Sequence, residues 1–315
     1  MPSPILVPNV YTEPVASVMR VLQLEGITDQ DDTFRGCSIP QIRRIYGGQV
    51  VAQGMLAAAA TVPDPERMPH SLHAYFLRGG RPGNPLTLKV DRLRDGRSFS
   101  SRGVNVFQQQ RVLMTMNVSF QGAEGGAESQ YAMPDVPGPE ALDSALELFR
   151  TLDHPVAKFL GKTSAFDVRH VQRSLYVAPG PGKEPMVPQT TQEVWMRPRT
   201  GIPAGTAQVV HRALLAYAVD QIMLEPSLRS VGLTWVTSGM SLASLDHAMW
   251  FHQDVDINQW LLFAGRSSSV RGGRAKAELS VYQRSGELVA TAAQEGMMRL
   301  PLDNAKASSR WTFEA

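Results

Sequence analysis

The sequence predicts an α+β fold made of two tandem repeats, each a long helix followed by an antiparallel sheet. Two observations support this prediction. A helical segment in the first half of the 315-residue chain resembles one in the second half, and the strand-like segments that follow each helix resemble each other too. Internal similarity of this kind indicates a repeated structural unit. Two such units would form one continuous sheet with both long helices on one side.

The two helical segments can be aligned without a gap. The segment "QVVAQGMLAAAATVP", from Gln49, aligns with "QVVHRALLAYAVDQI", from Gln208. Both are rich in Ala, Leu and Met, residues that favour helices. Each segment therefore predicts one long helix.

The segments downstream of each helix predict strands. "HAYFLRGG", from His73, aligns with "HAMWFHQD", from His247, and both have the aromatic content of strands. Farther on, alternating runs flank the polar turns "QQQR" and "QRSGE", which is typical of antiparallel hairpins. His73 lies 48 residues before Gln121 and His247 lies 47 residues before Gln294, which indicates a common register. The second half has a longer connection after its helix, "EPSLRSVGLTWVTSG", which we expect to be a loop.

These repeats predict four segments. They are a first repeat at 1–125, a linker with a helical connector at 126–164, a second repeat at 165–301 that carries the catalytic residues, and a tail at 302–315. The linker starts with "GAEGGAESQYAMPDVPGPEALD", rich in Gly, Pro and acid, and leads into the helical "ALELFRTLDHPVAKFL". Two repeats that share one sheet in this way form a double hotdog.

Composition excludes several classes of partner. The formal charge is +2 and 19% of residues are charged, so no broad basic surface is expected for nucleic acid. The lone cysteine, Cys37, cannot form an intrachain disulfide, and no Cys/His cluster has metal-ligand spacing. The N-terminus lacks the pattern of a signal peptide, and no apolar run is long enough to span a membrane. We therefore expect a cytoplasmic protein without membrane insertion.

One acid interrupts the second helix. Asp220 lies in "HRALLAYAVDQIML", and on a helix it shares a face with Ala216, Tyr217, Met223 and Leu224. That face should be buried. A carboxylate there needs a charged or hydrogen-bonding partner, and without one its pKa would rise. Asp220 is therefore a candidate general base.

Five stretches carry a resemblance to a known family. They are "YGGQVVAQGMLAA" at 46–58, "HSLHAYFLRGG" at 70–80, "LRDGRSFSSR" at 93–102, "DHAMWFH" at 246–252 and "AQEGMMR" at 293–299. In these stretches the sequence is similar to the bacterial acyl-CoA thioesterase II family, which has the double hotdog fold. The resemblance implies hydrolysis of fatty acyl-CoA to free fatty acid and CoA, without a cofactor.

The resemblance also implies three catalytic residues. The acid in "YAVD" is Asp220, the hydroxyl residue before "LDHAMW" is Ser244, and the glutamine in "AQEG" is Gln294. Asp220 would take a proton from a water that Ser244 and Gln294 orient. Direct attack by Asp220 on the thioester uses the same residues and stays open. The family commonly has threonine at the Ser244 position, so we expect activity to persist with a less tightly fixed hydroxyl.

Two groups of residues are candidates for substrate binding. The start of the first helix, at Gly47, Gly48 and Gln49, offers free N–H groups and a helix dipole to the developing oxyanion. The phosphates of CoA need cations, and arginines beside glycines are candidates, although surface solvation is an equally simple account of them. These arginines are Arg78, Arg81, Arg271 and Arg274.

The first repeat serves as an internal control. It places Thr61, His70 and Gln121 opposite the acid, the hydroxyl residue and the glutamine of the second repeat. Because it has no acid at that position, the sequence predicts one active site per chain.

The sequence leaves two other functions open. A non-catalytic acyl-CoA binding or sensing protein is one alternative, and a hotdog enoyl-CoA hydratase is the other. The hydratase needs an Asp and a His close together, but His211 is nine residues from Asp220. Proteins of this fold associate and sheet edges need covering, so we expect a homo-oligomer.

Overall fold

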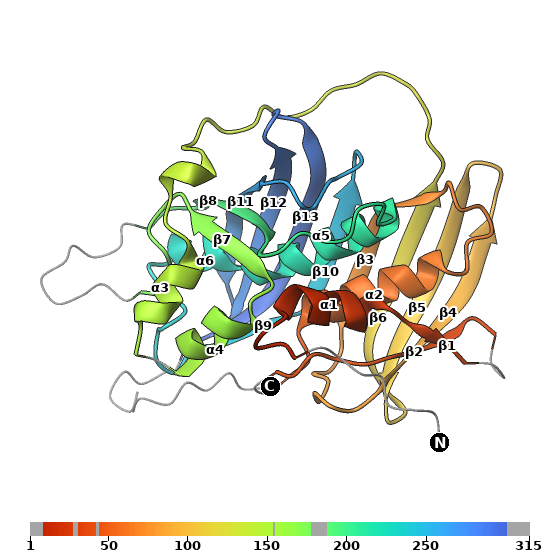
Figure 1. The fold of residues 1–315 in the computed structure, drawn as a ribbon, viewed down its shortest axis with the longest axis horizontal. Helices are drawn as coiled ribbons and strands as arrows, with labels where there is room; N and C mark the ends of the chain where they lie inside the picture. The colour runs from red at the N-terminus through yellow and green to blue at the C-terminus, as the bar shows by residue number, and fades with distance from the viewer. Residues whose placement is uncertain (1–8, 28–30, 42–43, 154, 178–187, 301–315) are drawn as a thin grey trace, which may run out of the picture.

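The computed structural model describes residues 9–27, 31–41, 44–153, 155–177 and 188–300, and Figure 1 shows their arrangement. The predicted tail at 302–315 lies outside these residues. The first half comprises α1 (Pro14–Leu22), β1 (Glu25–Gly26), β2 (Thr33–Gly36), α2 (Gly47–Ala59), β3 (Met68–Phe76), β4 (Leu86–Asp95), β5 (Phe99–Gln108) and β6 (Arg111–Gln121).

The connector and the second half follow in the same order. The connector comprises η1 (Pro139–Ala141), α3 (Ala145–Thr151) and α4 (Pro155–Thr163). The second half comprises β7 (Phe166–His170), β8 (Thr191–Pro198), α5 (Gln208–Ile222), α6 (Glu225–Ser230), β9 (Ser241–Ser244), β10 (Asp246–Phe251), β11 (Leu261–Arg271), β12 (Arg274–Gln283) and β13 (Leu288–Arg299). The predicted helical connector is thus a pair of short helices.

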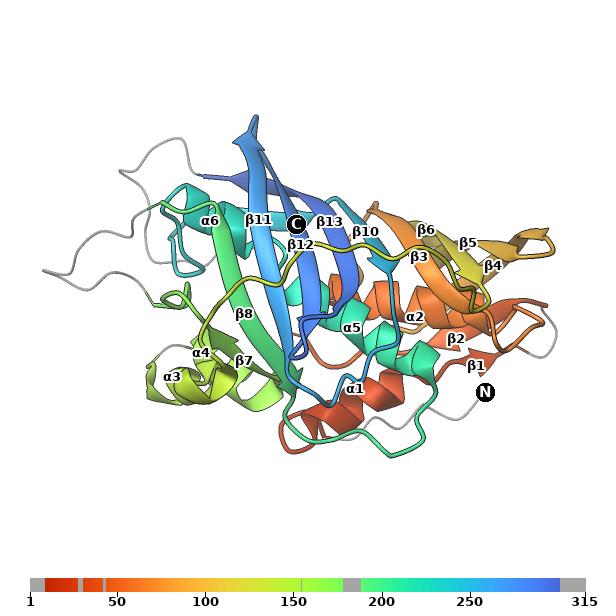
Figure 2. The ribbon, with the colours of Figure 1, turned by 90° about the horizontal axis from the view of Figure 1, so that it is seen from above.

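The described strands form one 13-stranded antiparallel sheet that is symmetric about its centre. Its order is β1-β2-β4-β5-β6-β3-β10-β13-β12-β11-β8-β7, and β9 pairs with β13 off this path. The two halves meet at β3 and β10, where Ala74 lies opposite His247. Figures 1 and 2 show α2 and α5 side by side on one face of the sheet, with α1 next to α2. The predicted fold class is therefore confirmed.

Several elements differ from the prediction. Each half also has strands before its long helix, because β2 pairs with β4 and β8 pairs with β11. Strand β3 begins five residues before His73, at Met68. The connection after α5, predicted to be a loop, starts with helix α6. Glu225 at its first position is fully buried and accepts hydrogen bonds from His170 Nε2 (3.0 Å), Trp235 Nε1 (2.8 Å) and Gln192. These contacts hold the short helix against β7 and β8.

Both predicted hairpin turns are present. Between β5 and β6, Gln109 and Gln110 have φ of 49° and 64°, so both residues of the two-residue turn adopt the left-handed backbone conformation. This geometry matches the twist of the flanking strands. Between β12 and β13 the turn is longer, and Gly286 adopts φ of 93°.

The strand pairing corrects the predicted equivalence of the repeats at Ser244. One extra residue interrupts the ladder in each half, His70 within β3 and Leu245 between β9 and β10. Aligning these two bulges makes Leu72, not His73, equivalent to His247, so the predicted alignment of the two histidines was wrong by one residue. It also places Pro69 at the position of Ser244. The prediction that His70 occupies this position was wrong, because the sequence comparison did not account for the bulge.

The same alignment corrects the predicted partner of Gln294. Val118, not Gln121, occupies the equivalent position in β6. The two strand ends are similar in sequence, but the hairpin turn of the first half is shorter, which shifts the register. Pro69 and Val118 have no side-chain hydrogen-bonding group. The first half therefore cannot form the same polar cluster.

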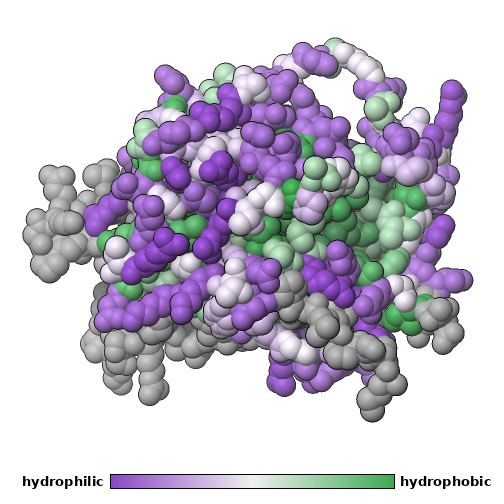
Figure 3. Space-filling view, viewed as in Figure 1, coloured by the Kyte–Doolittle hydropathy of each residue, from purple (hydrophilic) through white to green (hydrophobic). Residues whose placement is uncertain are grey.

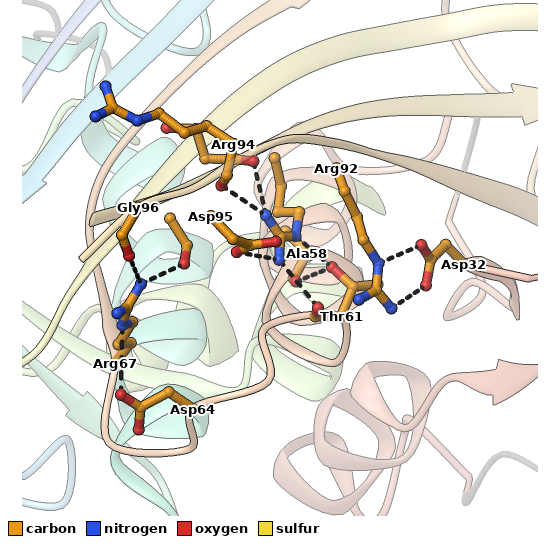
Figure 4. A network of polar contacts seen from close by, with 12 residues as sticks. Asp32, Ala58, Thr61, Asp64, Arg67, Arg92, Arg94, Asp95 and Gly96 are labelled. Atoms are coloured by element: carbon orange, nitrogen blue, oxygen red, sulfur yellow. Dashed lines mark hydrogen bonds and ion pairs between the residues drawn. The ribbon is translucent and has the colours of Figure 1, made fainter. Parts of the chain in front are cut away.

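Thr61, aligned with Asp220, has a structural role in the first half. Its Oγ1 donates to Ala58 O (2.8 Å) at the end of α2 and accepts from Arg102 Nε (2.8 Å). Arg102 is 0% exposed and also donates to Asp95 Oδ1 (2.8 Å), so this network ties the end of α2 to β4 and β5 (Figure 4).

The linker covers part of the sheet face opposite the helices. Its Met133 and Val136 pack against a cluster of buried side chains on that face of the second half, and Gln130 Nε2 donates to Gly286 O (2.8 Å). Figure 2 shows this segment crossing β12 and β13. On the helix side, Figure 3 shows apolar surface around α2 and α5, bordered by hydrophilic residues. In the described part of the chain, no helix is long and apolar enough to cross a membrane.

Candidate active site

Asp220 lies in the last turn of α5, where its apolar neighbours are buried as predicted. Tyr217 is 7% exposed and Met223 is fully buried, whereas Asp220 itself is half-buried. Its carboxylate is not left without partners. Oδ2 accepts from Gly48 N–H (2.7 Å) and Oδ1 accepts from Ser244 Oγ–H (3.2 Å). These bonds compensate for the loss of hydration around the carboxylate.

The structure brings the three predicted catalytic side chains together. Ser244 ends β9, beside β13, and Gln294 on β13 is 1% exposed. Gln294 Nε2 donates to Ser244 Oγ at 2.8 Å, and Ser244 donates to Asp220. A continuous hydrogen-bonded chain therefore runs from Gln294 through Ser244 to the carboxylate.

The start of α2 meets this chain from the first half. A Cβ at Gly47 would lie 2.9 Å from Asp220 Oδ2, and one at Gly48 would lie 2.6 Å from Tyr217 O, so both positions need glycine. The Gly48 N–H predicted for the oxyanion already donates to Asp220. The helix dipole thus stabilises the carboxylate itself. The Gln49 side chain is fully buried and bonds to Cys37 O and Gln53, not to the site.

Two tyrosines border the carboxylate. Tyr46 Oη donates to Tyr217 O (2.7 Å), and the two rings meet edge to face at 4.8 Å. Burial raises the pKa of both phenols, and the negative charge of Asp220 raises the pKa of each further. Both tyrosines therefore remain protonated at neutral pH, and the Tyr46 hydroxyl acts as a donor that fixes the position of α5.

A cavity of about 360 Å³ opens beside this cluster, and Gly47 and Ser244 line it. Its walls are mostly apolar, and its other lining residues include Ile45, Val50, Phe76, Leu113, Leu242 and Met297. Two arginines, Arg44 and Arg78, also line it. The cavity therefore combines apolar walls with two cationic side chains.

The predicted arginines do not all lie at this cavity. Arg78 lines it and donates to Val112 O (3.0 Å). Arg81, Arg271 and Arg274 are not among its lining residues, and Arg274 forms an ion pair with Glu295 (2.9 Å). Arg44, two residues before "YGGQ", is a lining residue that was not among the predicted arginines.

His247 is a second residue whose contact was not predicted. Its Nδ1 lies 2.6 Å from Gln294 Oε1. It extends the hydrogen-bonded chain by one member. Within the described residues, no group of three His, Cys, Asp or Glu side chains is placed to hold a metal ion.

Comparisons with known proteins match both halves. A model of the acyl-CoA thioesterase N-terminal domain matches residues 38–121, and one of the acyl-CoA thioesterase C-terminal domain matches residues 135–298. Acyl-CoA thioesterase 2 of Haemophilus influenzae is 33% identical over 288 residues, which cover 90% of this chain and 97% of the relative.

Solved structures show the same fold. The acyl-CoA thioesterase II TesB2 of Mycobacterium marinum has a TM-score of 0.71 and 36% identity, covering 90% of this chain and 99% of that one. A hot dog protein of Alicyclobacillus acidocaldarius, 19% identical, has a TM-score of 0.71 over 94% of this chain and 100% of its own, which supports the fold alone. Sequence and fold together show that this chain belongs to the acyl-CoA thioesterase family of thioester hydrolases.

Proposed function

We propose that this protein hydrolyses fatty acyl-CoA thioesters by a water that Asp220 activates and that Ser244 and Gln294 orient. The observation that supports this most is the hydrogen-bonded chain from Gln294 to Ser244 to Asp220, next to a cavity that Ser244 itself lines. The cavity has apolar walls for an alkyl chain or the pantetheine arm. Arg44 and Arg78 supply positive charge for the phosphates of CoA.

The chemistry assigns a task to each group. The oxygen of the water attacks the thioester carbonyl while Asp220 takes a proton from the water. The C–S bond then breaks and releases CoA thiolate. The positive end of α2, near Gly47 and Gly48, stabilises the charge of Asp220 and the negative charge that develops on the carbonyl oxygen of the substrate. In the direct route, Asp220 attacks the carbonyl, the C–S bond breaks to release CoA thiolate, and water then hydrolyses the mixed anhydride to the fatty acid and the Asp220 carboxylate.

The first experiment measures release of free CoA thiol from saturated acyl-CoAs of increasing length and, in parallel, hydration of an enoyl-CoA. We expect thiol release and no hydration. Binding without turnover would favour an acyl-CoA sensor, and hydration without thiol release would favour a hydratase. A single turnover in ¹⁸O-labelled water tests the direct route, because label in the Asp220 carboxylate requires an anhydride that water opens at the Asp220 carbonyl. An anhydride opened at the acyl carbonyl labels the fatty acid alone, as the base route does, so trapping of the anhydride with hydroxylamine completes the test.

Arg78 provides a test of the substrate's orientation. Arg78→Met should raise KM for acyl-CoA about 10-fold with little change in kcat, since it removes roughly one charge-assisted hydrogen bond from binding. The effect should shrink as salt is added. Arg271→Met is the matched comparison, because Arg271 is an exposed arginine on the β11–β12 hairpin. A larger KM effect at Arg271 would move the phosphate site to that hairpin.

A further inference from the structure

His247 lies next to Gln294 in the interior of the sheet. The two residues face each other across β10 and β13, each is 1% exposed, and His247 Nδ1 lies 2.6 Å from Gln294 Oε1. Because Ser244 donates to the Asp220 carboxylate, its Oγ accepts from Gln294 Nε2, and this places Gln294 Oε1 toward His247. An amide oxygen only accepts hydrogen bonds, so the contact with Oε1 requires the ring proton on Nδ1. Nε2 then carries a lone pair and no proton, and it is buried without a hydrogen-bond partner among the described residues.

This contact decides which way the Gln294 amide faces. The oxygen and nitrogen ends of a glutamine amide have nearly the same shape, so packing alone does not choose between them. A donor at Nδ1 holds Oε1 toward His247 and leaves Nε2 toward Ser244. Ser244 Oγ then accepts from Gln294, at 2.8 Å, and directs its own proton to Asp220 Oδ1.

The first half shows that this pair is not needed for packing. At the equivalent positions, Leu72 and Val118 face each other across β3 and β6 and are 0% and 1% exposed. An apolar pair therefore fills this place in the sheet without buried polar groups. Polar groups cost free energy when they are buried, and His247 leaves one nitrogen without a partner. A role in packing therefore does not explain why the second half has His247 and Gln294 at these positions.

We propose that His247 is a positioning residue that sets the direction of the hydrogen-bonded chain from Gln294 to Asp220. The inference rests on the proposed function, because the direction matters only if Asp220 and Ser244 hold the attacking water. Without the Nδ1 donor, Gln294 can turn its oxygen toward Ser244, and the Ser244 proton would then point to Gln294 and not to Asp220. The water would lose a fixed orientation.

The test compares two replacements of His247. His247→Leu fills a similar volume without a donor, and it should lower kcat on the order of 10-fold or more with little change in KM. His247→Asn places an amide N–H close to the position of Nδ1, and it should restore kcat to within about 3-fold of the wild type, far above the leucine variant. His73→Leu is the matched control, because His73 is exposed and contacts the Trp250 ring on the other face. It should leave kcat unchanged.

A spectroscopic measurement separates this inference from the proposed function. In ¹⁵N NMR of ring-labelled wild-type protein, His247 should show the Nδ1–H form, and in His247→Leu the Gln294 side-chain amide signals should shift. The Nε2–H form would overturn the inference whether or not the enzyme turns over acyl-CoA. Equal kcat values in the leucine and asparagine variants would also overturn it and leave His247 as a packing residue. If the wild type hydrolyses no acyl-CoA, the proposed function fails, and the tautomer still decides the direction of the chain.

Discussion

Asp220→Asn should lower kcat by about 10²- to 10⁴-fold, the range for loss of a general base, and should leave the fold intact. Asparagine has the same shape but cannot take a proton from water. Its oxygen can still accept from Gly48 N–H, and its nitrogen can donate to Ser244 Oγ, which has a second lone pair beside the one used by Gln294. Every contact of the side chain therefore has a substitute.

The measurement is steady-state thiol release, with circular dichroism and thermal unfolding on the same samples. Asp91→Asn is the matched control, since Asp91 is exposed on β4 of the first half and should retain full activity. Turnover in Asp220→Asn close to that of the wild type would place the base elsewhere. A collapse of activity in a protein that has lost its thermal transition would instead indicate that Asp220 holds the two helices together.

Gly48→Ala should both destabilise the protein and abolish most of its activity. The new Cβ would lie 2.6 Å from Tyr217 O and 2.8 Å from the Tyr46 ring, so the backbones of α2 and α5 must move apart. Overpacking of this kind costs about 1–3 kcal/mol, which exceeds the roughly 1 kcal/mol that alanine contributes to a helix over glycine. Because the Gly48 N–H also holds Asp220, a shift near 1 Å should cost on the order of 10²-fold in rate.

Urea unfolding and kcat/KM measure the two effects separately. Gly54→Ala is the matched control in the same helix. Its Cβ would meet Met116 Cε (2.7 Å) and Met114 Cε (3.2 Å), the ends of flexible side chains that can move aside. We expect near-normal activity there. An equal loss in both variants would show that the helix tolerates no alanine at either position, and would remove the special role of the contact between Gly48 and Asp220.

The repeated pattern made most of the fold predictable. The long helices, the strands that follow them and both hairpin turns were predicted correctly, because their periodicity and turn residues are local properties. The strands before each helix were missed, since β1 and β2 are short and no matching motif marks β7 or β8. Helix α6 was missed because the buried partners of Glu225 come from β7, β8 and a later loop.

The candidate site was predictable in part. The juxtaposition of Asp220, Ser244 and Gln294 was expected from the resemblance, but the bond from Gly48 to Asp220 depends on how closely two helices from different halves approach. The false match of Gln121 with Gln294 arose from a bulge and a turn of different length, which a residue pattern does not report. The homo-oligomeric state and the cytoplasmic location remain predictions.

The pairing of Leu72 with Val118 also bears on how a duplicated chain can change. If both repeats were identical, each polar cluster would occur twice, and every buried donor and acceptor would need a partner in both copies. Joining the copies in one polypeptide lets them diverge. One copy has apolar residues where the other has the histidine–glutamine pair, and it contributes a helix start to its sister's carboxylate. The two halves are thus interdependent, because the carboxylate belongs to one half and the N–H group that holds it belongs to the other, so neither half can change freely where α2 meets α5.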